Sequence, residues 1–206
     1  MKKHIPITTI FTDIGGVLLT NGWDRKSRAA AAKKFHLDVD ELNERHHLTF
    51  DTYESGKLDL EEYLSRVVFY EKRTFTRKQF REFMFSRSDE FPEMLDMMRK
   101  IKEKYKIKIA VVSNEGRELN AYRIKKFHLS EFVDFFISSC YVHFRKPDAD
   151  IFRVALDIAH VPCEQVVYLE DRSLFVHVAE GLGIRTIHHT DFETTKKKLS
   201  DLGFKL

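Results

Sequence analysis

The feature that most constrains the fold is an alternation of short apolar segments with amphipathic segments in the second half of the chain. An apolar, β-branched run from Ile5 to Thr12 precedes it and predicts a first strand. Strands that alternate with helices predict a parallel sheet with helices on both faces. The further expected strands are Ile107–Val112, Val133–Ile137, Gln165–Leu169 and Ile184–Ile187, and the helices are Phe91–Tyr105, Arg117–Phe127, Ala149–His160 and Leu174–Leu182. The fold expected is therefore α/β, with a Rossmann-like five-stranded parallel sheet.

The first half of the chain interrupts this alternation. About 100 residues separate Asp13 from Ser113, whereas a complete βαβ unit needs only about 30. The surplus, residues 21–87, carries helical patterns over Asp24–Phe35, Val39–Tyr53, Leu60–Tyr70 and Thr76–Phe85. We therefore expect a small all-helical cap domain over 21–87, inserted after the first strand of a core domain formed by 1–20 and 88–206. Phenylalanines are expected to fill its core and its seam with the sheet, namely Phe69, Phe75, Phe80, Phe83, Phe85 and Phe91.

Reactive side chains stand at the ends of three expected strands. Asp13 closes the first, Ser113 and Asn114 follow the second, and the pair Glu170–Asp171 follows the fourth. The carboxyl ends of parallel strands meet at one edge of the sheet, which is where ligands bind in open α/β folds. Each group alone has an ordinary interpretation, such as a helix N-cap or the start of a loop. Their coincidence favours a single site.

With Lys146, which precedes an expected helix, the set contains what phosphoryl transfer through an aspartyl-phosphate requires. A phosphate dianion repels a carboxylate nucleophile, so the site needs positive charge. Lys146 and a divalent cation held by Asp13 and Asp171 would supply it, while the Ser113 hydroxyl holds phosphate oxygens. Oxygen ligands favour Mg²⁺. No metal is assigned to His188–His189.

Four segments resemble the motifs of the haloacid dehalogenase-like hydrolase superfamily: Phe11–Val17 (FTDIGGV), Val111–Asn114 (VVSN), Arg145–Phe152 (RKPDADIF) and Tyr168–Asp171 (YLED). The resemblance spans essentially the whole chain, with the helical cap between the first two motifs. It implies that Asp13 is the nucleophile and a metal ligand, and that Lys146 acts with it. It also implies phosphate binding by Ser113, Lys146 and the neighbouring Gly15 and Asn114, and metal binding by the Gly15 carbonyl and Asp171, with Glu170 beside it.

The chain departs from that pattern at Gly15, where most phosphatases of the superfamily carry a second aspartate as general acid and base. A positioned acid accelerates a reaction by ~10²–10⁴-fold, which is roughly 3–5 kcal/mol of barrier. Its absence argues against a phosphomutase. It favours phosphatase substrates whose leaving groups need little protonation, such as anomeric, aryl or acyl phosphates. The Asp-x-Gly-Gly pattern resembles a sub-branch that includes α-glucose-1-phosphate phosphatases, so a sugar 1-phosphate is the leading substrate candidate.

Substrate choice is expected to rest with residues near the linker and the cap: Asn21, Trp23, Arg25, His46 and His47. A histidine at 46 or 47 is one candidate to replace the missing acid, because histidine titrates near neutral pH. Two ordinary exposed histidines are the favoured alternative. The expected partner is a small phosphorylated metabolite.

Two other functions remain open at this point. A 2-haloacid dehalogenase would use Asp13 without a second acid, but it leaves Glu170–Asp171 unexplained. The second open function is that of a phosphate-binding protein without turnover.

Composition limits the remaining classes. A net charge of +3, spread along the chain, gives no reason to expect a nucleic-acid partner. No apolar run approaches membrane-spanning length, and Lys2 and Lys3 precede a stretch that fits a strand better than a signal peptide. The two cysteines are far apart, so no disulfide is expected. These observations predict a cytoplasmic monomer or weak homodimer.

Overall fold

A computed structural model of the chain describes residues 6–206. The start of the predicted first strand at Ile5, and the lysines at positions 2 and 3, lie outside the described residues. Five parallel strands form one sheet in the order β3-β2-β1-β4-β5. Their bounds are Thr9–Thr12 (β1), Lys108–Ser113 (β2), Phe135–Ser138 (β3), Val166–Glu170 (β4) and Arg185–His188 (β5). The predicted α/β fold with a five-stranded parallel sheet is confirmed.

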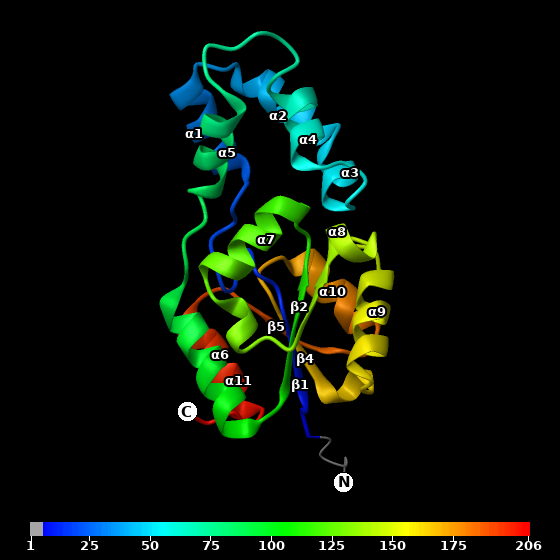
Figure 1. The fold of residues 1–206 in the computed structure, drawn as a ribbon. Coiled ribbons are helices and arrows are strands. Elements are labelled where there is room, and N and C mark those ends of the chain that lie inside the picture. The colour runs from blue at the N-terminus through cyan, green and yellow to red at the C-terminus, as the bar shows by residue number, and fades with distance from the viewer. Residues whose placement is uncertain (1–5) are drawn as a thin grey trace.

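Helices cover both faces of the sheet, as the pattern predicted (Figure 1). One face packs against α6 (Pro92–Tyr105), α11 (Phe192–Asp201) and the residues that follow α7 (Arg117–Lys126), and the other against α9 (Asp150–Ala159) and α10 (Ser173–Gly181). Successive strand residues point to opposite faces: Ile10 belongs to the first apolar cluster and Phe11 to the second. Short helices that the sequence pattern did not predict are α8 (Ser139–Val142), η1 (Leu129–Glu131) and η2 (Cys163–Gln165).

Five further helices gather beyond the carboxyl ends of the strands (Figure 1). They are α1 (Arg25–Phe35), α2 (Val39–His47), α3 (Phe50–Glu54), α4 (Leu60–Val67) and α5 (Arg77–Phe85), and we call them the helical module. They share an apolar core in which Phe80 is fully buried and against which Phe69, Phe75, Phe83 and Phe85 pack, and Leu119 of α7 also belongs to it. Phe91 instead packs against the core of the sheet.

One helix boundary differs from the prediction in a way that matters for the site. The segment Val39–Tyr53 was predicted as one helix, but it is broken between His47 and Phe50. The Thr49 hydroxyl donates to the Arg45 carbonyl (2.6 Å), and the Thr49 N–H donates to the His46 carbonyl (3.0 Å), three residues back. Local hydrogen bonds of this kind compete with regular helix bonding. The break allows α3 to turn toward the sheet, where Tyr53 and Glu54 line the cavity described below.

No helix among residues 6–206 is both long and apolar enough to cross a membrane.

Candidate active site

Asp13 directly follows β1, the central strand, so it lies at the middle of the sheet's carboxyl edge. Its N–H donates to the Leu169 carbonyl (3.0 Å), which extends the pairing with β4 by one residue. Its Oδ1 accepts from the Ile14 N–H (2.8 Å), and its Oδ2 lies 3.1 Å from Lys146 Nζ. The Ser113 side chain, at the end of β2, is buried and lines the same cavity as Asp13. Backbone pairing therefore fixes where the Asp13 carboxylate stands.

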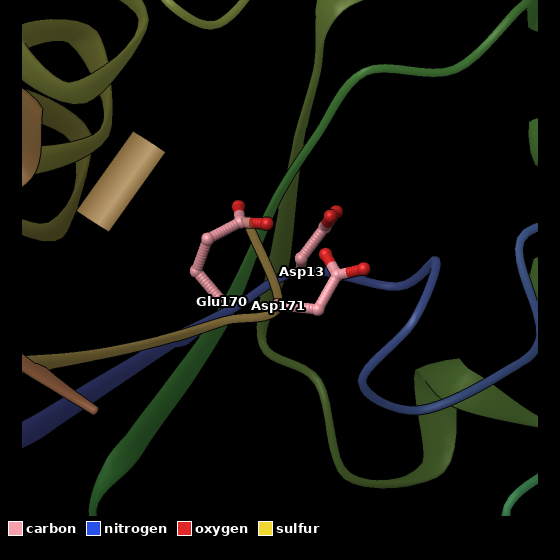
Figure 2. Close-up of side chains that lie close together, drawn as sticks. All are labelled: Asp13, Glu170 and Asp171. Carbon is pink, nitrogen blue, oxygen red and sulfur yellow. The ribbon is translucent and has the colours of Figure 1, made fainter. Parts of the chain in front are cut away.

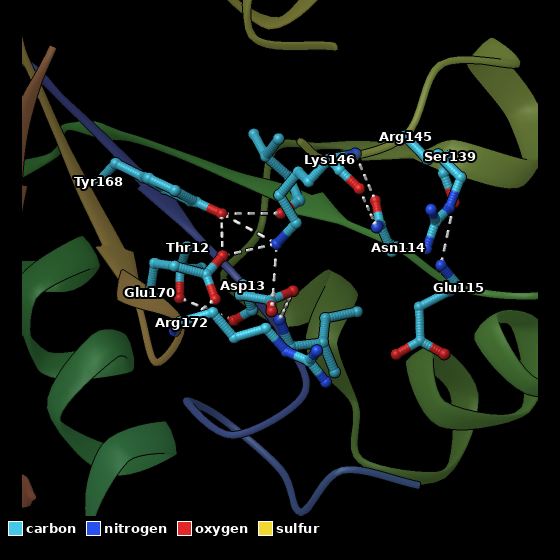
Figure 3. Close-up of polar contacts among 12 residues, drawn as sticks. Thr12, Asp13, Asn114, Glu115, Ser139, Arg145, Lys146, Tyr168, Glu170 and Arg172 are labelled. Carbon is cyan, nitrogen blue, oxygen red and sulfur yellow. Dashed lines mark hydrogen bonds and ion pairs between the residues drawn. The ribbon is translucent and has the colours of Figure 1, made fainter. Parts of the chain in front are cut away.

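Lys146 is a fully buried ammonium whose three hydrogens have three partners (Figure 3). Its Nζ lies 2.7 Å from Glu170 Oε2, 2.9 Å from the Tyr168 hydroxyl and 3.1 Å from Asp13 Oδ2. The Asn114 side chain fixes the Lys146 backbone, accepting from its N–H and donating to its carbonyl, both at 2.8 Å. Asn114 thus contributes to the site by placing Lys146, and its predicted phosphate contact stays a prediction.

The charges in this network are mutually dependent. Burial raises the pKa of Asp13, and the positive charge of Lys146 opposes that shift. Burial alone would lower the pKa of Lys146, but Asp13 and Glu170 outweigh it and raise that pKa. Burial and the charge of Glu170 hold the pKa of Tyr168 well above its usual value, so the Tyr168 hydroxyl keeps its proton and donates it to Glu170. The lysine is therefore charged at neutral pH and held by anionic partners.

Asp13, Glu170 and Asp171 bring carboxylate oxygens within 4.8 Å of one another (Figure 2). Both Glu170 oxygens accept hydrogen bonds, Oε2 from Lys146 and Tyr168 and Oε1 from the Arg172 N–H (3.0 Å). Asp171 Oδ1, in contrast, is buried and has no hydrogen-bond partner among the described residues. A buried carboxylate oxygen without a partner is costly unless a cation binds it. The donor set and this orphaned oxygen fit a hard divalent cation.

Gly16 explains why Asp171 can approach the loop after Asp13 so closely. Its φ is +77°, and a Cβ at this position would lie 2.2 Å from Asp171 Oδ2. Any side chain here would meet both an unfavourable backbone conformation and the carboxylate. The Asp171 backbone carbonyl accepts a hydrogen bond from His188 Nε2 (2.9 Å), so His188 supports the loop behind the carboxylate.

A cavity of about 350 Å³ lies between this edge and the helical module. The sheet side contributes Asp13, Gly15, Ser113, Asn114 and Lys146, and the helical module contributes Arg25, Arg28, His46, Phe50, Tyr53 and Glu54. The linker that joins the two supplies Asn21 and Trp23. Of the residues predicted to govern substrate choice, all but His47 line the cavity; His47 is exposed and stacks on Phe50.

Contacts between α3 and the sheet side border the cavity. Arg145, next to Lys146, pairs with Glu54 (2.7 Å) and Asp51 (2.6 Å). The Ser139 hydroxyl donates to the Glu54 carbonyl (2.6 Å) and accepts from the Glu115 N–H (3.0 Å). These bonds place the module directly over the Asp13 edge.

Contributors to the site that sequence reasoning missed include Tyr168, Arg145, Arg28 and the buried ion pair of Glu115 with Arg123. Tyr168 stands two residues before Glu170 on the same face of β4, and Arg145 immediately precedes Lys146. Their places beside predicted site residues could have indicated both Tyr168 and Arg145. No sequence pattern indicates the pair of Glu115 and Arg123, because its role depends on how α7 packs.

The family model of the haloacid dehalogenase-like hydrolases matches residues 7–173. The chain belongs to this family. The resemblance stated from the four motifs is thereby confirmed, and the activity class is that of a hydrolase. No similar sequence was found among curated proteins.

Solved structures of this family share the fold. An enzyme of the haloacid dehalogenase family from Bacteroides thetaiotaomicron, solved in complex with magnesium and inorganic phosphate, is 21% identical with a TM-score of 0.76, covering 89% of this chain and 94% of its own. A predicted hydrolase of the family from Porphyromonas gingivalis is 21% identical with a TM-score of 0.74, covering 94% and 98%. The L-2-haloacid dehalogenase from Xanthobacter autotrophicus is 15% identical with a TM-score of 0.62, covering 95% and 83%.

Proposed function

We propose that the protein is a Mg²⁺-dependent phosphomonoester hydrolase that acts on a small phosphorylated metabolite through an aspartyl-phosphate at Asp13. One observation carries the proposal: a carboxylate paired with a buried lysine stands beside an orphaned carboxylate oxygen, near the cavity between the sheet edge and the helical module. The complex of the Bacteroides thetaiotaomicron enzyme with magnesium and inorganic phosphate supports it. We also propose that residues 21–87 are a cap domain over a core formed by 1–20 and 88–206.

Asp13, Asp171 and the Gly15 carbonyl would hold the cation, with Glu170 adjoining, and the bound cation would supply charge neutralisation at the phosphoryl oxygens. The chain's own groups then perform the transfer. Lys146 and the Ser113 hydroxyl orient the phosphoryl group so that Asp13 attacks phosphorus in line with the leaving oxygen. One phosphorus–oxygen bond forms to Asp13 as the bond to the leaving group breaks. Water then cleaves the aspartyl-phosphate and regenerates the carboxylate.

The position of the absent acid bears on the substrate. A Cβ at Gly15 would lie 2.9 Å from Asn21 Oδ1, so the Asn21 amide stands where a longer side chain at 15 would begin. An amide does not donate a proton to a departing alkoxide. We therefore propose leaving groups that depart without an acid, with an anomeric sugar 1-phosphate as the leading candidate.

A panel of anomeric, aryl and alkyl phosphates, assayed with Mg²⁺ and with EDTA, tests the proposal. Turnover should require Mg²⁺ and should be lost in Asp13→Asn, while the exposed matched control Asp40→Asn keeps it. Unchanged turnover in Asp13→Asn would refute the mechanism. Halide release from 2-haloacids without Mg²⁺ would favour the hypothesis of a 2-haloacid dehalogenase. Tight binding of phosphate esters with no turnover would favour the hypothesis of a phosphate-binding protein.

Gly15→Asp, compared with Gly15→Ala, tests the argument about the missing acid. The displaced atom is the far end of the Asn21 side chain, which can rotate away. Gly15→Asp should raise the rate most on alkyl phosphates, whose leaving groups are poor. Equal gains on aryl and alkyl esters would contradict the argument.

A further inference from the structure

Arg28 differs from the other arginines that line the cavity. Arg123 is ion-paired with Glu115, and Arg145 with Glu54 and Asp51. Arg25 and Arg172 are exposed to solvent. Arg28 is half-buried, and no carboxylate of residues 6–206 lies within ion-pair distance of it.

The hydrogen-bond partners of Arg28 are both neutral. Its Nε donates to Asn43 Oδ1 (2.9 Å), and one terminal nitrogen donates to the Trp23 carbonyl (2.8 Å). These bonds hold the guanidinium in place, and the carboxylates of Asp24 and Glu54 attract it only from beyond ion-pair distance. Its remaining terminal nitrogen is free to donate to a ligand, and a partly desolvated guanidinium without an ion-pair partner favours an anion.

His46 stands beside Arg28, and its protonation is set by a chain of hydrogen bonds. Trp23 Nε1, which can only donate, donates to the Tyr63 hydroxyl (2.8 Å). The single hydroxyl proton of Tyr63 then goes to its other partner, His46 Nδ1 (2.7 Å). His46 Nδ1 is therefore the acceptor nitrogen, and the neutral ring carries its proton on Nε2.

His46 is neutral, so it does not replace the absent general acid. Burial is the main cause, followed by the charge of Arg28, and together they lower the pKa of His46 to about 3. Among the described residues none accepts a hydrogen bond from Nε2. The helical wall of the cavity thus presents a guanidinium without an ion-pair partner among the described residues and a neutral N–H donor, both with capacity for an oxygen acceptor.

We propose that Arg28 and His46 form a subsite for a carboxylate carried by the leaving group of the substrate. This inference rests on the proposed phosphatase activity, in which Asp13 and Lys146 take the phosphoryl group at the opposite wall. The free terminal nitrogen of Arg28 and Nε2 of His46 can each donate to one oxygen of a carboxylate. A carboxylate is also smaller than a second phosphate group, which suits a cavity of about 350 Å³ that must hold the phosphoryl group as well.

Two matched substrate pairs test the subsite: α-glucose 1-phosphate against α-glucuronic acid 1-phosphate, and phenyl phosphate against 4-carboxyphenyl phosphate. The carboxylated member should have the higher kcat/KM, by about tenfold to a hundredfold, as expected for a charge-assisted hydrogen bond. Arg28→Gln should bring this ratio close to one, Arg28→Lys should restore part of it, and His46→Leu should lower it. Lys26→Gln removes a charge from the exposed side of the same helix and should leave the ratio unchanged.

The outcomes separate the two proposals. Hydrolysis of all four esters with no preference for the carboxylated members, or a ratio unaltered in Arg28→Gln, overturns the subsite and leaves the phosphatase standing. If no ester is hydrolysed, the proposed function fails, and calorimetric binding of the two aryl phosphates decides the subsite. Tighter binding of the carboxylated ester, lost in Arg28→Gln, supports it, and equal binding of the two esters overturns it.

Discussion

Replacing Lys146 with methionine should produce an enzyme that is inactive yet binds Mg²⁺ more tightly than the wild type. The lysine is fully buried between Asp13 (3.1 Å) and Glu170 (2.7 Å). With Asp171, three carboxylates and one ammonium leave this cluster a net charge of −2. Lys146→Met keeps the apolar stem and removes the only cation among these four groups. The variant cluster therefore attracts a divalent cation more strongly.

The magnitude follows from the burial. Removing one partner of a buried ion pair costs about 3–5 kcal/mol, because the remaining charge is left uncompensated. The metal-free variant should lose about this much free energy of unfolding. Bound Mg²⁺ stabilises a protein by ~2.7 kcal/mol at a hundredfold excess over its Kd, and each tenfold gain in affinity adds ~1.4 kcal/mol. Mg²⁺ should thus offset part of the loss in Lys146→Met and raise the stability of the variant more than that of the wild type.

The assay is urea unfolding at pH 8 in EDTA and in saturating Mg²⁺, for wild type, Lys146→Met and the exposed control Lys197→Met. Phosphatase turnover is measured in parallel, and it should fall at least about a hundredfold in Lys146→Met. Equal stabilisation by Mg²⁺ in wild type and Lys146→Met would refute the reasoning, since the lysine would then not share its anions with the cation. A loss below about 1 kcal/mol in EDTA would also contradict it, because that is the scale of an exposed pair.

Three further predictions concern the same cavity. Asp171→Asn should raise the Mg²⁺ concentration needed for half-maximal activity more than Glu170→Gln does, because Asp171 Oδ1 is unpartnered whereas both Glu170 oxygens accept hydrogen bonds; the reverse order in a Mg²⁺ titration would make Glu170 the stronger ligand. In thermal melts, Gly116→Ala should destabilise the protein by about 1–3 kcal/mol, and it should also raise KM, since its Cβ would lie 2.1 Å from the Tyr53 ring. The control Gly181→Ala, with open space around it, should not destabilise the protein in the same melts. The pKa of His46 is about 3 in the folded protein and near 6.5 in the unfolded chain. The contribution of His46 to the free energy of unfolding is therefore complete above pH 6.5 and is lost as the pH falls toward 3. In urea unfolding between pH 7 and 5, wild type should lose about 2 kcal/mol more than His46→Gln, and equal losses would show that the histidine titrates normally.

The site could be predicted from the sequence wherever it follows from strand ends. Asp13, Ser113 and Glu170 each close an apolar strand, and parallel pairing brings strand ends together whatever the helices do. The backbone bond from Asp13 to Leu169 is the local consequence of that register. Lys146 lies on a loop, and its place rested on chemical need and on the motif resemblance.

The cavity's opposite wall could not be predicted in the same way. The pattern over Val39–Tyr53 is compatible with one helix, and only the hydrogen bonds of Thr49 reveal the break that turns α3 toward the sheet. The contact of Arg145 with Glu54 joins residues 91 positions apart, which no local periodicity encodes. His46 was predicted as a candidate acid or an exposed histidine, but it is half-buried and neutral, and it is held by a hydrogen bond with Tyr63 from another helix.

The two walls together account for how a cavity without a general acid could still select its substrate. Carboxylates gather at the sheet edge, so in the proposed reaction this end would receive the phosphoryl group only together with Lys146 and a cation. The other end presents Arg28, a guanidinium without an ion-pair partner among the described residues. A substrate with one anion at each end would therefore fit in a single orientation, with its phosphorus toward Asp13. Binding energy gained at Arg28 would then orient the phosphoryl group for the proposed in-line attack, which raises the rate by positioning where proton donation is absent.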